Sequence, residues 1–268
     1  MIINPYAFGG GGGATLWTPA EITTALWLDA DDEDSFTLDG SDIDQWDDKS
    51  GNDRHATPAT ATKPTRTASG INSMGSVVFG SGTDPLLTST FANPASADGF
   101  TLAMVLRRDG QPVNFSNPIT KGAVNAEWSL IWANTAQGNI SYWRSNLAGG
   151  NTVATASSTL VDATDYLWSC RMSNTDIAEY RWGTIIGGPG AAGTNRPPAG
   201  TTALTIGSSP DGTYANNRFQ GTIAEIVLVH ADVTTATRQL LEGYLAWKWG
   251  LEGSLPGGHP YESAAPTV

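Results

Sequence analysis

The sequence is poor in cysteine and in basic residues, and each shortage excludes a class of protein. A single cysteine, Cys170, rules out an intrachain disulfide, so the chain is not a small disulfide-dependent scaffold. Because Cys170 lies in an apolar run, we expect it to be buried as a small hydrophobe. Fourteen Lys and Arg stand against 26 Asp and Glu, which gives a net charge of −12. Phosphate backbones and anionic membranes repel such a chain, so we expect no nucleic-acid partner and no membrane insertion.

Long apolar segments are missing as well. No run of about 18 apolar residues occurs, so no segment is predicted to span a membrane. The first residues, MIINPYAF, lack the basic and apolar regions of a secretory signal, and we expect no signal peptide. Charged residues make up only 15% of the chain, whereas 31 Gly and 15 Pro are typical of turn-rich β-structure. Ten Trp is a high count, but Trp both fills sandwich cores and stacks on sugar rings.

An apolar tip precedes a run of glycines at the N-terminus. The large apolar side chains of the tip are Ile2, Ile3, Tyr6 and Phe8, and Gly9 to Gly13 follow them. Five consecutive glycines form a flexible hinge. Large apolar side chains are costly to leave in water, so we interpret residues 1–13 as a docking tip and hinge for the domain at 14–268. The alternative is a frayed terminus without a role.

Segments with the two-residue alternation of β-strands recur along the domain. Phe100, Leu102, Met104 and Leu106 alternate with smaller or polar neighbours. Two hairpins are predicted, one from residues 128–133 and 139–144 and the other from 165–173 and 177–186. Residues 221–231 are apolar on both faces apart from Glu225, as expected of a central strand covered on both sides. About ten strands separated by Gly, Asn and Pro turns predict one antiparallel β-sandwich.

One helix is predicted near the C-terminus, within VTTATRQLLEGYLAWKWGL. Thr234 or Thr235 can cap its N-terminus, and Gly250 suits its C-terminal cap. One face of the helix carries Leu241, Tyr244, Leu245 and Lys248. An aromatic and proline cluster is expected to fix the helix and the tail onto the sandwich; it contains Trp247, Trp249, Pro256, His259, Pro260 and Tyr261.

Two segments resemble the concanavalin A-like lectin/glucanase superfamily, in its laminin-G-like jelly-roll branch. The first, LWLDADDEDSFTLDGSDIDQWDDKSGNDRHAT, contains Trp-x-Asp and Trp-x-Asp-x-Ser-Gly. The second, GTIAEIVLVHADVTTATRQLLEGYLAWKWGLEGSLPGGHPY, is similar to the strand and helix that end this branch. The resemblance implies an all-β, antiparallel jelly-roll sandwich with one short C-terminal helix. Domains with this opening and closing occur in structural proteins of tailed bacteriophages and in bacterial surface proteins.

Motifs of catalysis are missing from the sequence. Glucanases of this superfamily carry two Glu and an Asp on one strand, and no Glu-x-Asp-x-(x)-Glu occurs here. Glu225 has Ile223 and Val227 two residues away on either side. The three His are scattered, and no nucleophile elbow, zinc spacing, P-loop or dinucleotide motif is present. We therefore expect that the protein is not an enzyme.

The Asp-rich segment is a candidate calcium site. Related jelly rolls often hold Ca²⁺, which prefers carboxylate oxygens, and the candidate ligands are Asp29, Asp31, Asp47 and Asp48. Their spacing does not fit an EF-hand, and a solvated loop with Asx-turns is the alternative. No other cofactor is predicted.

Aromatic residues near Asn side chains are candidates for carbohydrate binding, as the lectin resemblance implies. They are Trp132, Tyr142, Trp143, Asn146, Tyr214 and Asn216. The alternative for most of the Trp residues is packing in the core or on a sheet face.

The tip and the resemblance together favour a non-catalytic virion surface protein of a tailed phage. It would be anchored by the tip on the head or tail and would display a lectin-like sandwich for decoration or host attachment. Other virion proteins would be its partners, with a cell-surface glycan and further copies of the chain as additional candidates. The alternative is a carbohydrate-binding adhesin module of a bacterial surface protein.

Overall fold

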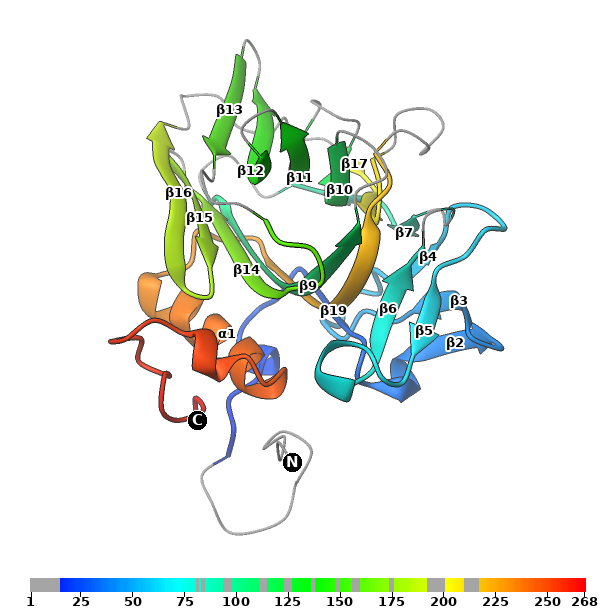
Figure 1. The fold of residues 1–268 in the computed structure, drawn as a ribbon, viewed down its shortest axis with the longest axis horizontal. Helices are drawn as coiled ribbons and strands as arrows, with labels where there is room; N and C mark the ends of the chain where they lie inside the picture. Colours follow the sequence, from blue (N-terminus) through cyan, green and yellow to red (C-terminus); the bar gives the residue numbers. More distant parts are fainter. Residues whose placement is uncertain are drawn as a thin grey trace.

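The computed structural model has two layers of antiparallel β-strands, with an α-helix on the outside of one layer (Figure 1). The described residues are 15–80, 82, 85–93, 98–110, 115–122, 127–135, 138–147, 150–155, 160–173, 176–191, 201–209 and 217–268. Nineteen strands, one α-helix and four 3-10 helices lie within these ranges. The predicted fold class, an all-β jelly-roll sandwich with one C-terminal helix, is confirmed.

The first layer is built around two long central strands. In order of pairing its strands are β1 (Leu26–Asp29), β19 (Gln220–Val229), β9 (Phe100–Gly110), β14 (Asp165–Met172), β15 (Asp176–Arg181) and β16 (Thr184–Ala191). Helix α1 (Thr235–Lys248) lies on the outer side of this layer (Figure 1).

The second layer contains β7 (Leu86–Thr88), β18 (Leu204–Ile206), β10 (Phe115–Lys121), β11 (Trp128–Thr135), β12 (Gly138–Leu147) and β13 (Gly150–Thr155). Short strands join the two layers along one edge: β2 (Phe36–Asp39), β3 (Asp42–Trp46), β4 (Ala56–Pro58), β5 (Thr65–Thr67) and β6 (Ser76–Phe79). A separate two-stranded sheet pairs β8 (Phe91–Ala92) with β17 (Thr201–Thr202). The 3-10 helices are Pro19–Glu21, Glu33–Ser35, Ile71–Ser73 and Glu252–Ser254.

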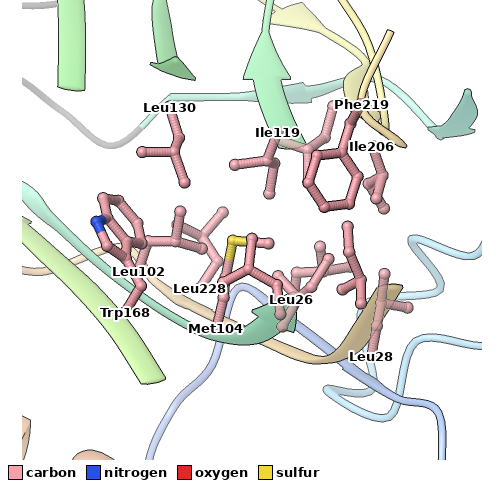
Figure 2. Close-up of a cluster of buried hydrophobic side chains, with 14 of the residues drawn as sticks. Leu26, Leu28, Leu102, Met104, Ile119, Leu130, Trp168, Ile206, Phe219 and Leu228 are labelled. Atoms are coloured by element: carbon pink, nitrogen blue, oxygen red, sulfur yellow. The ribbon is translucent and has the colours of Figure 1, made fainter. Parts of the chain in front are cut away.

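Alternation along the strands divides the apolar side chains between two clusters. On β9, Leu102, Met104 and Leu106 belong to the cluster between the layers. Figure 2 shows this cluster, in which Leu26, Leu28, Leu102, Met104 and Leu228 of the first layer meet Ile119, Leu130, Ile206 and Phe219. Ala103 and Val105, the alternate residues of β9, belong to the other cluster, where Leu241 and Leu245 of α1 pack on the outer face. Strands β9 and β19 are therefore covered on both sides, as predicted for residues 221–231.

The pairing of both predicted hairpins and the predicted helix are confirmed, but the segment predicted as one strand at 177–186 is divided by a turn into the end of β15 and the start of β16. Strand β11 pairs with β12 and β14 pairs with β15, each in an antiparallel register. The Thr234 hydroxyl accepts a hydrogen bond of 3.1 Å from the amide of Thr237, which makes Thr234 the N-cap. Gly250 follows the helix with φ of +66°, the left-handed conformation in which glycine is favoured. Cys170 is fully buried, also as expected.

The estimate of about ten strands was too low, because several strands were missed, among them β2 to β5 along the joining edge and β10 and β13 in the second layer. Strands β2 to β5 are three to five residues long and carry Asp, Thr, Gln and Pro, so they have little local β signal. Their pairing depends on distant partners, such as Ala56 opposite Thr88 and Thr65 opposite Val78.

The N-terminal segment and the C-terminal tail of the described chain lie side by side. Leu16 forms a bridge with Thr267, and the Trp17 amide donates a 2.9 Å hydrogen bond to the carbonyl of Pro266. The tail is also fixed to the helix, because the Trp247 indole N–H donates to the Tyr261 carbonyl at 2.8 Å. Among the described residues, no helix is long and apolar enough to cross a bilayer.

Candidate functional site

A buried carboxylate, Glu225, lies at the centre of the outer face of the first layer. Asp29 on β1 is its direct partner across the strands, so both side chains point to the face that α1 covers. On α1, Tyr244 and Lys248 are four residues apart and therefore lie on one side of the helix. Strand register and helix periodicity together bring Asp29, Glu225, Tyr244 and Lys248 to one place.

Every oxygen of Glu225 is used by a protein donor. One oxygen accepts hydrogen bonds from the Trp27 indole at 2.7 Å and the Tyr244 hydroxyl at 2.8 Å. The other accepts from Lys248 Nζ at 2.8 Å and the Trp249 indole at 2.7 Å. Glu225 is 0% exposed, and a carboxylate buried without partners would be strongly destabilising. These four bonds stabilise it in place.

The charges continue from Glu225 towards the surface in alternating sign. Lys248 Nζ is 2.6 Å from Asp29 Oδ1, and Lys49 Nζ is 3.1 Å from Asp29 Oδ2 and 2.6 Å from Asp32. Burial raises the pKa of Asp29, but Lys248 and Lys49 outweigh it and the pKa lies below its ordinary value. Burial also raises the pKa of Glu225, and Lys248 only partly opposes this shift. The carboxylates in turn keep the pKa of Lys248 above its ordinary value despite burial.

An open pocket of about 280 Å³ lies beside this network. Its lining residues are Thr18, Trp27, Asp29, Asp31, Asp32, Lys49, Tyr244 and Lys248. They come from the N-terminal segment, from β1 and the loop that follows it, from the loop after β3, and from α1. The pocket combines two aromatic side chains with charged groups that the network holds in place, which is the kind of lining that orients a polar ligand.

The four predicted calcium ligands are divided between two places. Asp29 and Asp31 line the pocket, where Asp31 Oδ1 also accepts a 2.9 Å bond from the Gly75 amide. Asp48 accepts instead from the amides of Trp27, Ser50 and Arg54, so the Trp-x-Asp-x-Ser-Gly motif shapes its own loop. Asp47 accepts from Gln45 at 2.7 Å. Within the described ranges no three His, Cys, Asp or Glu side chains gather as metal ligands, and calcium binding stays a prediction.

One predicted sugar-stacking residue is wrong. Trp132 is 0% exposed and packs edge-on against Phe219 and Tyr166, with ring centroids 5.6 and 6.1 Å away, so its ring cannot contact a sugar. Tyr142, Trp143 and Asn146 lie on β12, and their side chains fall outside the described part. Tyr214, Asn216 and the tip residues Ile2, Ile3, Tyr6 and Phe8 lie outside the described residues altogether.

The sequence did contain a signal for the network. Glu225 is the one charged residue in an apolar strand, and Lys248 ends the apolar face of the helix. Each is unusual in its setting, and two buried charges of opposite sign are expected to pair. Lys49 and Trp27 carried no comparable signal.

A second cluster of charged groups surrounds Phe91 on β8. Lys121 Nζ is 3.8 Å from the Phe91 ring centroid and donates at 2.7 Å to the Phe91 carbonyl, while the Arg54 guanidinium lies 4.3 Å from the same ring. Burial lowers the pKa of Lys121 to about 8. The His230 ring is 5.7 Å from Phe91, and burial together with Arg54 and Lys121 lowers its pKa to about 4.

Comparisons with known proteins agree with the fold. No protein-family model and no curated protein matches the sequence. The chain is similar to domain 4 of AbnA, a GH43 extracellular arabinanase from Geobacillus stearothermophilus, solved in complex with arabinotriose. The TM-score is 0.58 at 10% identity, over 80% of this chain and 95% of that one.

Two further solved structures share the architecture. A mutant of HCR D/C VPI 5995 has a TM-score of 0.58 at 12% identity, over 83% of this chain and 52% of that chain. Trypanosoma rangeli sialidase in complex with 2,3-difluorosialic acid has a TM-score of 0.50 at 16% identity, over 87% of this chain and 34% of that chain. The chain thus spans about half and about a third of these two proteins. At such identities the likeness shows the fold alone, a jelly-roll β-sandwich.

We expect Glu225→Gln to destabilise the protein by about 3–5 kcal/mol, because an amide has one acceptor oxygen in place of two and leaves some of the four buried donors without a partner. The measurement is urea unfolding at pH 7. The matched control is Asp44→Asn, which removes the exposed ion pair with Lys63 and should leave the free energy of unfolding nearly unchanged. Equal effects of the two variants would show that the Glu225 network does not stabilise the fold.

His230 should make stability fall as the pH drops from 6.5 to 4. An unfolded His binds a proton near pH 6.5, whereas folded His230 stays neutral down to about pH 4, so acid favours the unfolded state in this window. We expect His230→Gln to lack this contribution. The test is urea unfolding of the wild type and of His230→Gln between pH 4 and 7.5. The difference between their free energies of unfolding isolates His230, because the carboxylates are common to both proteins. A constant difference across the range would contradict the assignment.

Proposed function

We propose that the chain is a non-catalytic, lectin-like module that binds a glycan and is displayed on the surface of a tailed-phage particle. The observation that carries glycan binding is the jelly-roll sandwich itself. It overlaps 95% of an arabinanase domain that was solved with arabinotriose. The pocket beside α1 adds an opening with aromatic and hydrogen-bonding side chains.

The state of the buried carboxylates supports the absence of catalysis. Glycoside hydrolysis uses two carboxyl groups that reach the glycosidic bond from opposite sides, one of them as a proton donor. Asp29 and Glu225 instead hold Lys248 between them, and Glu225 accepts four hydrogen bonds from protein donors. Glu225 is fully buried, and the two oxygens of Asp29 are taken by Lys248 and Lys49, so neither carboxylate is free to act as a nucleophile or a proton donor.

Display on a particle is proposed from the sequence of the first residues. Four large apolar side chains stand before five glycines, a pattern suited to a peptide that docks in a partner while the sandwich pivots. The second candidate is an adhesin module of a bacterial surface protein, which would bind the same class of ligand but would not need the tip.

Glycan binding is tested on an array of bacterial surface sugars with the full chain, once with Ca²⁺ and once with EDTA. We expect binding to a defined glycan that survives EDTA, because two ammonium groups already neutralise Asp29. Binding lost in EDTA would support a calcium site in the Asp-rich segment. A blank array under both conditions would contradict glycan binding and favour a structural decoration.

Particle display is tested by exchanging Ile2, Ile3, Tyr6 and Phe8 for Ser in the phage genome while the glycine run is kept. We expect the chain to disappear from purified particles, because the apolar side chains provide the docking surface. The melting temperature of the isolated variant should match the wild type, which separates docking from folding. Unchanged incorporation would rule out the tip as the anchor.

A further inference from the structure

We propose that the pocket between β1 and α1 binds one neutral sugar unit and rejects anionic sugars. This inference rests on the proposed glycan binding and adds to it the place and the charge class of the ligand. This pocket is not the carbohydrate-binding site that the sequence predicted. Strand β12, which carries Tyr142 and Trp143, belongs to the second layer, whereas α1 lies on the outer side of the first (Figure 1).

The size of the pocket favours an organic ligand over a lone ion. Its volume of about 280 Å³ is many times the share of one water molecule, about 30 Å³. The positions that a cation would take between the carboxylates are already filled by ammonium groups. Lys248 stands between Asp29 and Glu225, and Lys49 stands between Asp29 and Asp32.

The lining offers both donors and acceptors, which sugar hydroxyls need. Lys49 has three ammonium hydrogens, and Asp29 and Asp32 accept two of them. Asp31 and Asp32 each use one carboxylate oxygen, for the Gly75 amide and for Lys49, which leaves a second oxygen on each as an acceptor. The Thr18 hydroxyl adds a group that can do both. Trp27 and Tyr244 also line the pocket, but they are only 8% and 2% exposed and Lys49 Nζ lies 4.8 Å from the Trp27 ring centroid, so they bound the site without offering an open ring face for stacking.

The charge around the pocket determines the class of sugar. Asp29, Asp31 and Asp32 line it and Glu225 lies directly behind, whereas only Lys49 and Lys248 are positive. Both lysines are already bound to Asp29. A sugar carboxylate or phosphate would therefore face the open oxygens of Asp31 and Asp32 without a free cation to balance it. A neutral hexose or pentose meets no such repulsion.

The place is tested by filling the pocket from its edge. The Thr18 side chain makes no capping bond to the 3-10 helix that follows it, so Thr18→Tyr adds bulk without removing a capping hydrogen bond. The matched control is Thr62→Tyr at an exposed loop position away from the lining. Binding of arabinotriose and of the neutral array glycans to the full chain is measured by titration calorimetry. We expect at least a tenfold loss of affinity in Thr18→Tyr and no change in Thr62→Tyr.

The charge class is tested with galactose and galacturonic acid, which differ by a carboxylate at one carbon. We expect the wild type to prefer galactose, and Asp31→Asn to reduce this preference severalfold. If Thr18→Tyr bound glycan as tightly as the wild type, the pocket would not be the binding site. The proposal that the protein binds a glycan would still stand. Preference for the acid, or a preference that Asp31→Asn does not change, would overturn the charge argument. Failure of every sugar to bind the wild type would overturn the proposed function together with this inference.

Discussion

The structure depends on the pairing of Glu225 with Lys248. Glu225 lies in the middle of a strand that is apolar on both faces, and its side chain is directed away from the main core. A carboxylate at such a place has to be satisfied by the element that covers it. Helix α1 does so with a lysine and a tyrosine one turn apart, and Trp249 and Trp27 complete the set. The position of the helix along the sheet is thereby fixed by hydrogen bonds as well as by apolar packing.

A second buried carboxylate, Glu242, attaches the same helix to β14 and to the C-terminal tail. Glu242 accepts a 2.7 Å hydrogen bond from Ser169 on β14 and is paired with Arg238 one turn earlier. His259 from the tail lies 3.4 Å from its other oxygen. The C-terminal part of the helix is thus held to β19 through Tyr244 and Lys248, and its middle is held to β14 and the tail through Glu242. Desolvation offsets much of the attraction within buried ionic groups that are fully paired, whereas removing one partner of such a pair is strongly destabilising.

Local sequence patterns predicted the individual strands and the helix better than they predicted which of these elements contact one another. Alternation over Phe100 to Leu106 and the apolar face of the helix follow from backbone geometry alone, and both appear as expected. The same rule placed Trp132 on one face with Trp128 and Leu130, which is the core face, so its burial was also readable from the sequence. The pocket could not be predicted from the sequence, because its lining residues come from four separate segments. These segments contribute Thr18, Asp29, Lys49 and Lys248. Only strand register and the position of the helix bring them together.

The bridge between Leu16 and Thr267 has a consequence for engineering. Since the two ends of the described chain are neighbours, a short peptide can join them without disturbing either layer. New ends can then be opened in an exposed loop such as the one at residues 60–62, which gives a circular permutant with the same contacts in a different chain order. The order in which the strands are synthesised could be changed in this way, and the folding of the sandwich could be followed from either layer first.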